Sequence, residues 1–173
     1  PADRDPVLRD LCTGAAELDD DALAVRVGAI REAFEESGLL LARRCDTDSP
    51  LDAAEVMRMG AAYRSDLAVG RISLAEVAVR ERLAVTVDEI FPFAHWITPE
   101  VMPKRYDTHF FLAAAPPDQL ALHDGTESVD SAWVAPDAAL AEADAGRRTI
   151  IFPTRMNLVK LAPAGSIAEA VAR

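Results

Sequence analysis

The chain has 173 residues, of which 50% are hydrophobic and 27% are charged, and its formal net charge is −11 at pH 7. This composition is typical of a globular protein that is long enough to bury a core of its own. The negative charge argues against nucleic acid or an anionic membrane surface as the main partner, because both would repel the chain. We therefore expect a single soluble domain over residues 1–173.

The first helix is predicted at about residues 20–37. The segment before it is polar and acidic and ends in Asp19, Asp20 and Asp21, which can cap a helix and stabilise its first turn. Gly38 is suited to the position that follows a helix. The apolar residues at helical spacing should form the buried stripe of this helix: Leu23, Val27, Ile30 and Phe34.

The opposite side of this helix carries three glutamates, Glu32, Glu35 and Glu36. Like charges at these spacings repel by roughly 0.2–0.5 kcal/mol per pair, and anions near a helix C-terminus oppose its dipole. Arg31 offsets part of this cost, and a bound divalent cation would offset the rest, since Mg²⁺ and Mn²⁺ prefer carboxylate oxygens. A plain solvated face is the alternative interpretation.

A short buried strand is predicted at residues 39–42, and a turn at 46–50. A helical hairpin insert should follow over about residues 50–85, with one apolar side formed by Leu51, Val56, Met59 and Ala62. Gly70 separates its helices, and Ser73 with Glu76 has the form of a capping box for the second one. The insert either covers a binding site or only enlarges the core.

Two longer strands are predicted at residues 90–98 and 104–115, the second from its regular alternation. A turn at 114–118 and a short strand at 119–123 should follow. The chain should end in three helices at 136–145, 155–162 and 166–171.

The remaining candidates for chemistry are weaker. Three histidines, His95, His109 and His123, show no spacing typical of a zinc site, although the first two could lie in adjacent strands and transfer protons. Arg105 could bind a substrate phosphate through paired hydrogen bonds. The two cysteines are expected to be free thiols, and no signal peptide is visible, which favours a cytoplasmic location.

The residues from Arg31 to Leu39 resemble the second half of the Nudix box, the signature of hydrolases that act on nucleoside diphosphates linked to another group. The first half departs from that pattern: Glu17 and Leu23 stand where the family has a glycine and a glutamate, and Gly14 lies three residues too early. Residues 93–99 and 104–111 resemble the Nudix branch that is similar to a peroxisomal acyl-coenzyme A diphosphatase.

The resemblance implies an α/β/α sandwich around a mixed sheet, with some N-terminal strands upstream of Pro1. It also implies a site for Mg²⁺ or Mn²⁺ held by Glu35 and Glu36, with Glu32 completing or flanking it. Residues 127–134 resemble the Nudix strand that ends in a tryptophan, and from this strand Glu127, or Asp130 as second choice, would reach the site. The metals would orient and activate a water, and Glu32, Glu35 or a residue of a later loop would act as general base. Arg31 would hold the glutamates by ion pairing.

The substrate that the resemblance favours is a small-molecule diphosphate, first coenzyme A or an acyl-CoA and next a nucleotide sugar or dinucleotide. A homodimer is compatible with this prediction. Two alternatives remain: a Nudix-fold module that has lost turnover and only binds a nucleotide or a partner, which the altered first half of the box favours, and a helical interaction domain that binds no metal.

Overall fold

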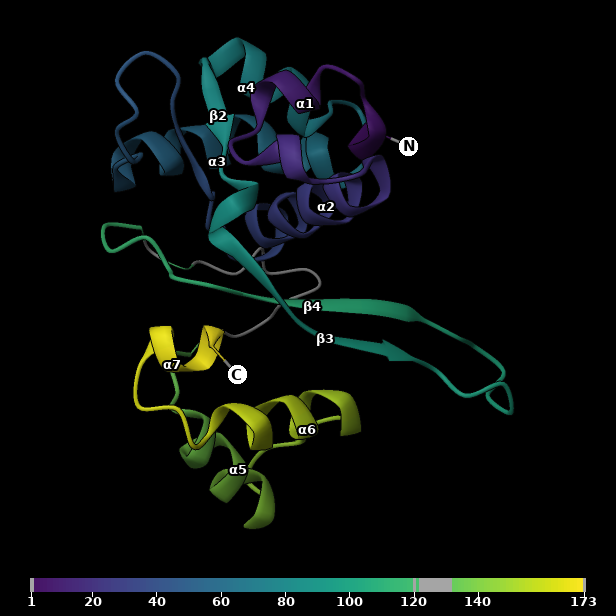
Figure 1. The fold of residues 1–173 in the computed structure, drawn as a ribbon. Coiled ribbons are helices and arrows are strands. Elements are labelled where there is room, and N and C mark those ends of the chain that lie inside the picture. The colour runs from purple at the N-terminus through teal and green to yellow at the C-terminus, as the bar shows by residue number, and fades with distance from the viewer. Residues whose placement is uncertain (1, 120, 122–131, 173) are drawn as a thin grey trace. The chain divides into compact units, whose positions relative to one another are not determined.

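The computed structural model describes residues 2–119, 121 and 132–172. The chain divides into two compact units, the first formed by Pro1–Ile90 and Ala113–Ser131 and the second by Phe91–Leu112 and Ala132–Arg173. Figure 1 labels the α-helices of both units and the strands β2, β3 and β4.

The first unit is mainly helical and contains one small sheet. In this sheet β1 and β2 pair antiparallel, with Ala42 opposite Val85, and Cys12 adds a single parallel bridge to Val85. The sheet therefore combines both strand directions. The elements in chain order are η1 (Ala2–Arg4), α1 (Leu8–Leu11), η2 (Ala15–Glu17), α2 (Asp20–Ser37), β1 (Ala42–Arg44), α3 (Ala53–Ala68), α4 (Leu74–Glu81), β2 (Leu83–Val85) and η3 (Val87–Glu89).

Helix α2 begins and ends where its capping residues predict. The Asp19 side chain accepts a hydrogen bond from the Ala22 backbone N–H at 2.7 Å. At the other end Gly38 adopts φ 73°, and its N–H donates to the Phe34 carbonyl. The predicted apolar stripe is buried, with Leu23, Val27, Ile30 and Phe34 between 0% and 6% exposed. The prediction for this helix is confirmed.

The predicted strand at residues 39–42 is wrong in its position, because β1 begins only at Ala42. Leu40 is fully buried, but its backbone pairs with a side chain instead of a neighbouring strand. The Leu40 N–H donates to Gln119 Oε1 at 2.9 Å, and Gln119 Nε2 donates to the Leu40 carbonyl at 3.0 Å. Gln119 thus takes the place of a strand partner, although it lies 79 residues away in sequence.

The helical insert is confirmed as α3 and α4. The predicted capping box is present, because Ser73 Oγ accepts from the Glu76 N–H while the Glu76 carboxylate accepts from the Ser73 N–H. Two details differ from the prediction. Ala62 is exposed, and the second helix ends at Glu81, because Arg82 adopts a left-handed conformation with φ 57° and leads the chain into β2.

The second unit consists of a two-stranded sheet and three helices: β3 (Ile90–Ile97), β4 (Asp107–Ala113), α5 (Pro136–Asp144), α6 (Phe152–Leu161) and α7 (Ile167–Val171). Within this unit Trp96 of β3 donates from Nε1 to Asn157 Oδ1 of α6 at 3.0 Å and meets the Phe152 ring edge-on. These contacts attach α6 to the sheet. Both long strands and all three C-terminal helices were predicted, and they are confirmed.

The region after β4 is only partly described. The predicted turn is confirmed by the hydrogen bond from the Gln119 N–H to the Pro116 carbonyl at 3.2 Å. Gln119 and Ala121 lie outside any strand, and the rest of the predicted strand at 119–123 lies outside the described residues. Of the predicted strand at 127–134, residues 132–134 are described, and none of them is in a strand. Among the described residues, no helix combines the length and the apolar character needed to cross a membrane.

Candidate active site

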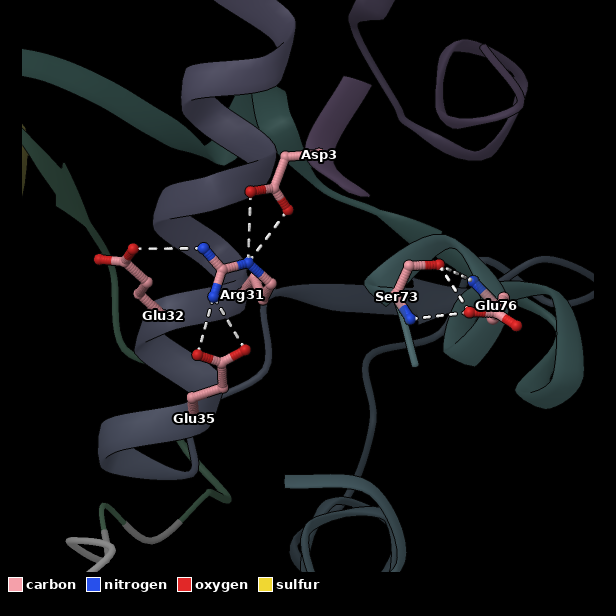
Figure 2. A network of polar contacts seen from close by, with 6 residues as sticks. All are labelled: Asp3, Arg31, Glu32, Glu35, Ser73 and Glu76. Atoms are coloured by element: carbon pink, nitrogen blue, oxygen red, sulfur yellow. Dashed lines mark hydrogen bonds and ion pairs between the residues drawn. The ribbon is translucent and has the colours of Figure 1, made fainter. Parts of the chain in front are cut away.

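A four-residue network of charged groups lies along the second half of α2, and Figure 2 shows it from close by. Arg31 is its centre. Its Nη1 donates to both carboxylate oxygens of Glu35, at 2.9 and 2.8 Å. Its Nε donates to Asp3 of η1 at 3.0 Å, and its Nη2 reaches Glu32 at 3.2 Å. One guanidinium therefore holds three carboxylates through separate nitrogens.

Burial makes this network stronger than a surface ion pair. The side chains of Arg31, Asp3 and Glu35 are only 21%, 22% and 11% exposed. Burial by itself disfavours the charged guanidinium, but the hydrogen bonds to Glu35 and Asp3 outweigh it and raise the pKa of Arg31 above its usual range. Arg31 therefore carries a fixed positive charge next to the glutamates of the acidic face.

The three glutamates of the helix differ in their surroundings. Glu35 is nearly buried and bound to Arg31, whereas the Glu32 side chain is 63% exposed and Glu36 is also exposed. Glu32 and Glu36 are four residues apart, so their side chains lie one above the other on the same face of the helix. Their carboxylate oxygens have the chemistry that Mg²⁺ and Mn²⁺ prefer.

The end of α2 is held by neighbouring groups as well. Arg64 of α3 donates from Nε and Nη2 to the Glu35 carbonyl at 3.0 and 2.7 Å. Ser37 Oγ donates to the Ala33 carbonyl at 2.6 Å. The Glu35 carbonyl is one of the last of the helix and has no partner within it, so the bonds from Arg64 satisfy a group that would otherwise need water. Helix α3 of the insert thus fixes the backbone of Glu35.

Comparison with known proteins shows which family the chain belongs to. The family model described as the NUDT19 Nudix domain matches residues 2–160. The chain belongs to this Nudix family. It is also similar to a crystal structure of a Nudix hydrolase from Alicyclobacillus acidocaldarius, with a TM-score of 0.78 and 23% identity, over 98% of this chain and 77% of that chain. The predicted α/β Nudix fold is confirmed.

The predicted class of enzyme, a Nudix hydrolase, is confirmed by the family model. Membership of the Nudix hydrolase family supports a pyrophosphohydrolase activity, and enzymes of this class generally use divalent metals. The likeness to the branch of the peroxisomal acyl-CoA diphosphatases is confirmed by the family model. The roles of Arg31, Glu32, Glu35 and Glu36 in catalysis stay predictions.

The altered first half of the Nudix box forms a close contact with η3. Gly14 adopts φ 68°, and a Cβ at this position would lie 2.5 Å from Asp88 Cβ. Thr13 Oγ1 forms a hydrogen bond with Asp88, and the Thr13 N–H donates to the Val85 carbonyl at 2.9 Å. Gly14 is therefore required by the fold, although it is out of register with the glycine of the Nudix pattern.

Two of the predicted site residues are not joined to the network by the described structure. Glu127 lies outside the described residues. Arg105 belongs to the second unit and donates from Nε to the Thr98 carbonyl at 3.0 Å, within the connection between β3 and β4. Their predicted roles in metal and phosphate binding stay predictions.

Asp3 is a residue of the network that the sequence did not indicate. It lies 28 residues before Arg31, in a polar segment that contains several aspartates, and no spacing rule connects the two. Only the packing of η1 against α2 brings its carboxylate to Arg31. The sequence offers one weak signal for Asp3: a polar N-terminal segment precedes a helix that carries an arginine.

Proposed function

We propose that this Nudix hydrolase depends on Mg²⁺ or Mn²⁺ and cleaves the diphosphate linkage of coenzyme A or an acyl-CoA. The observation that carries the proposal is the difference among the box glutamates. Arg31 binds both oxygens of Glu35, while Glu32 and Glu36 on the same helix are exposed to solvent. A helix whose acidic face is partly anchored and partly open is suited to hold cations at a fixed place.

The cations would be held by Glu36 and Glu32, with Glu35 contributing from its position against Arg31 and Glu127 as a further ligand. When bound, they would neutralise the diphosphate and lower the pKa of a bound water. Arg31 orients Glu35, because two of its hydrogen bonds end on that carboxylate. Asp3 in turn orients Arg31 through Nε. Either Glu32 or Glu35 would accept the proton of the attacking water.

The substrate class rests on the family. The matching family model and the resemblance of residues 93–99 and 104–111 both support the acyl-CoA diphosphatase branch. A nucleotide sugar or dinucleotide is the second candidate, and Arg105 is the proposed contact to substrate phosphate. A net charge of −11 argues against nucleic acid or membrane partners, so the enzyme should act on small molecules. The proposed location is the cytoplasm, and a homodimer is compatible with this proposal.

A second candidate function is a Nudix module that binds its ligand without turnover. The observation that favours it is the first half of the box, where Glu17 and Leu23 replace the family's glycine and glutamate. The Leu23 side chain has no donor atom for a metal and packs in the core, 6% exposed, so it cannot replace the family's glutamate as a ligand. The intact glutamates of the second half count against this candidate.

The test is a panel of coenzyme A, acetyl-CoA, ADP-ribose and a dinucleotide, each incubated with the full chain and Mg²⁺ or Mn²⁺. Products are identified by mass spectrometry. We expect 3′,5′-ADP and a phosphopantetheine from the CoA substrates, loss of both in Glu36→Gln, and normal release in the control Glu100→Gln, which changes an exposed glutamate outside the box. Tight ligand binding without product in any reaction would support the binding module instead.

A further inference from the structure

The second unit contains a cluster of groups with metal-binding chemistry on the sheet formed by β3 and β4. His95, Asp107 and His109 each offer one ligand atom, and these atoms all lie within 4.8 Å of one another. We propose that these three side chains form a binding site for a divalent transition metal ion of the zinc type. The site uses none of the Nudix box residues and does not depend on the proposed function.

The register of the two strands explains why these residues meet. The Thr98 N–H donates to the Tyr106 carbonyl at 2.9 Å, where β3 and β4 join through their connecting loop. Three steps back along β3 from Thr98 and three steps forward from Tyr106 lead to His95 and His109, which are therefore cross-strand neighbours. Asp107 precedes His109 by two residues and shares its face of the sheet.

The side chains confirm this arrangement. The rings of His95 and His109 stack with centroids 4.0 Å apart and planes 12° from parallel. Asp107 Oδ1 is hydrogen-bonded to His95 Nε2 and lies 4.0 Å from His109 Nε2. Both imidazoles thus present the same nitrogen, Nε2, to one carboxylate oxygen.

The separation of His109 Nε2 from Asp107 Oδ1 is close to what a zinc ion needs, whereas the hydrogen-bonded His95 and Asp107 must move apart to admit the ion. Zinc binds imidazole nitrogen and carboxylate oxygen at about 2.0–2.1 Å, so two ligand atoms of a tetrahedral site lie about 3.4 Å apart. The distance of 4.0 Å between His109 Nε2 and Asp107 Oδ1 is larger by an amount that small side-chain rotations can remove.

The chemistry of the donors selects the class of ion. Two imidazoles and one carboxylate suit zinc, nickel, copper or ferrous iron, whereas magnesium prefers oxygen alone. Asp107 Oδ1 lies next to the Nε2 atoms of both imidazoles and supplies the third donor. The three side chains are 44%, 64% and 42% exposed, which lets the ion enter and leaves its remaining positions to water or a small anion.

An ordinary histidine–aspartate ion pair would account for one of these contacts but not for all three. A single pair needs only His95 and Asp107. The second imidazole adds a donor that such a pair does not use, because its ring stacks on that of His95 and its Nε2 lies 4.0 Å from the same carboxylate oxygen.

The test is calorimetric titration of the full chain with Zn²⁺ in excess Mg²⁺, which occupies oxygen-only sites. We expect one equivalent of Zn²⁺ to bind the wild type, and affinity to fall at least about tenfold in His109→Ala and in Asp107→Asn, since even changes around a ligand cost about 10- to 100-fold. Asp107→Asn preserves the shape of the side chain, so its loss of affinity cannot be attributed to a failure to fold.

Two controls separate this proposal from the Nudix site. Glu36→Gln should bind Zn²⁺ as the wild type does while it loses hydrolysis, and His123→Ala should leave Zn²⁺ binding unchanged. The proposal is overturned if Zn²⁺ does not bind in excess Mg²⁺, if the cluster variants bind it as tightly as the wild type, or if Glu36→Gln abolishes it.

Discussion

Arg31 and Glu35 face each other one helical turn apart on α2, and Arg31 Nη1 lies 2.9 and 2.8 Å from the two carboxylate oxygens of Glu35. The Nε of the same guanidinium donates to both carboxylate oxygens of Asp3, at 3.0 and 3.3 Å. The position of Glu35 therefore depends on a residue of η1 that lies far from the Nudix box in sequence.

Asp3→Asn should weaken the support of Arg31 without changing the box itself. A hydrogen bond to a charged group contributes about 1.5–3 kcal/mol, and because Asp3 is partly exposed we expect a loss of about 1–2 kcal/mol in the free energy of unfolding. We also expect kcat to fall about tenfold with KM nearly unchanged, as for other residues that support a ligand. Denaturant unfolding and steady-state kinetics measure both. The exposed Asp10→Asn is the control, and equal kinetics in the two variants would exclude a positioning role for Asp3.

Gly14→Ala should destabilise the first unit more than the same change at Gly70. Both glycines have left-handed backbones, with φ 68° and 69°, so an added Cβ costs about 1–2 kcal/mol at either position. Only at Gly14 would the new Cβ also meet Asp88 Cβ, at 2.5 Å, whereas nothing lies within 4 Å at Gly70. Chemical denaturation of the two variants measures the difference, and equal losses would show that the loop before α2 does not pack on η3.

Gln119→Leu should leave the buried backbone of Leu40 without hydrogen-bond partners. Gln119 is 7% exposed, and its amide satisfies both the N–H and the carbonyl of Leu40. An unsatisfied buried polar group costs about 1–3 kcal/mol, so we expect a loss of at least about 2 kcal/mol. Gln119→Glu retains the acceptor but not the donor and should be intermediate at neutral pH. Hydrogen exchange at the Leu40 amide measures the protection of this backbone group directly. Unchanged protection in Gln119→Leu would contradict the pair of hydrogen bonds between Gln119 and Leu40.

The insert should contribute to stability in a way that depends on pH. Glu81, at the end of α4, accepts from Arg58 at 3.0 and 2.6 Å and from the Tyr63 hydroxyl at 2.8 Å. The hydrogen bonds from Arg58, against the effect of burial, lower the pKa of Glu81 from its ordinary value of 4.5. A lowered folded pKa gives stability that is fully present above pH 4.5 and is lost as the pH falls through the folded value.

Glu81→Gln should therefore be less stable than the wild type at pH 7, and the difference should shrink below pH 4.5. Thermal unfolding across this range measures it, with Glu100→Gln as the control. A difference that stays constant as the pH falls would show that the carboxylate does not titrate in this way.

The elements that could be predicted from the sequence are those fixed by local signals. Helix α2 was located by Asp19 at its start and Gly38 at its end, and α4 by the pair Ser73 and Glu76, because capping depends on residues within one turn. The strands β3 and β4 followed from alternation. The strand predicted at Leu39 failed because its partner is the Gln119 side chain, and no local rule reports a contact across 79 residues.

In the candidate site, too, local arrangements could be predicted and contacts between distant residues could not. Arg31 and the three glutamates were found together because they lie on one helix and their spacing determines their geometry. Asp3 was missed because only tertiary packing brings it to Arg31. His95 and His109 were placed in adjacent strands, but Asp107 was not connected with them, because the register that unites the three depends on the loop between the strands.

Manganese binding to the Nudix box is the most direct test of the account. Electron paramagnetic resonance counts free Mn²⁺ as it is added to the full chain, with His109→Ala as the background to exclude the histidine cluster. We predict that this protein binds Mn²⁺, that adding Glu36→Gln weakens binding at least about tenfold, and that adding Glu100→Gln has no effect. Equal Mn²⁺ affinity with and without Glu36→Gln would contradict the central claim that the acidic face of α2 holds the catalytic cations.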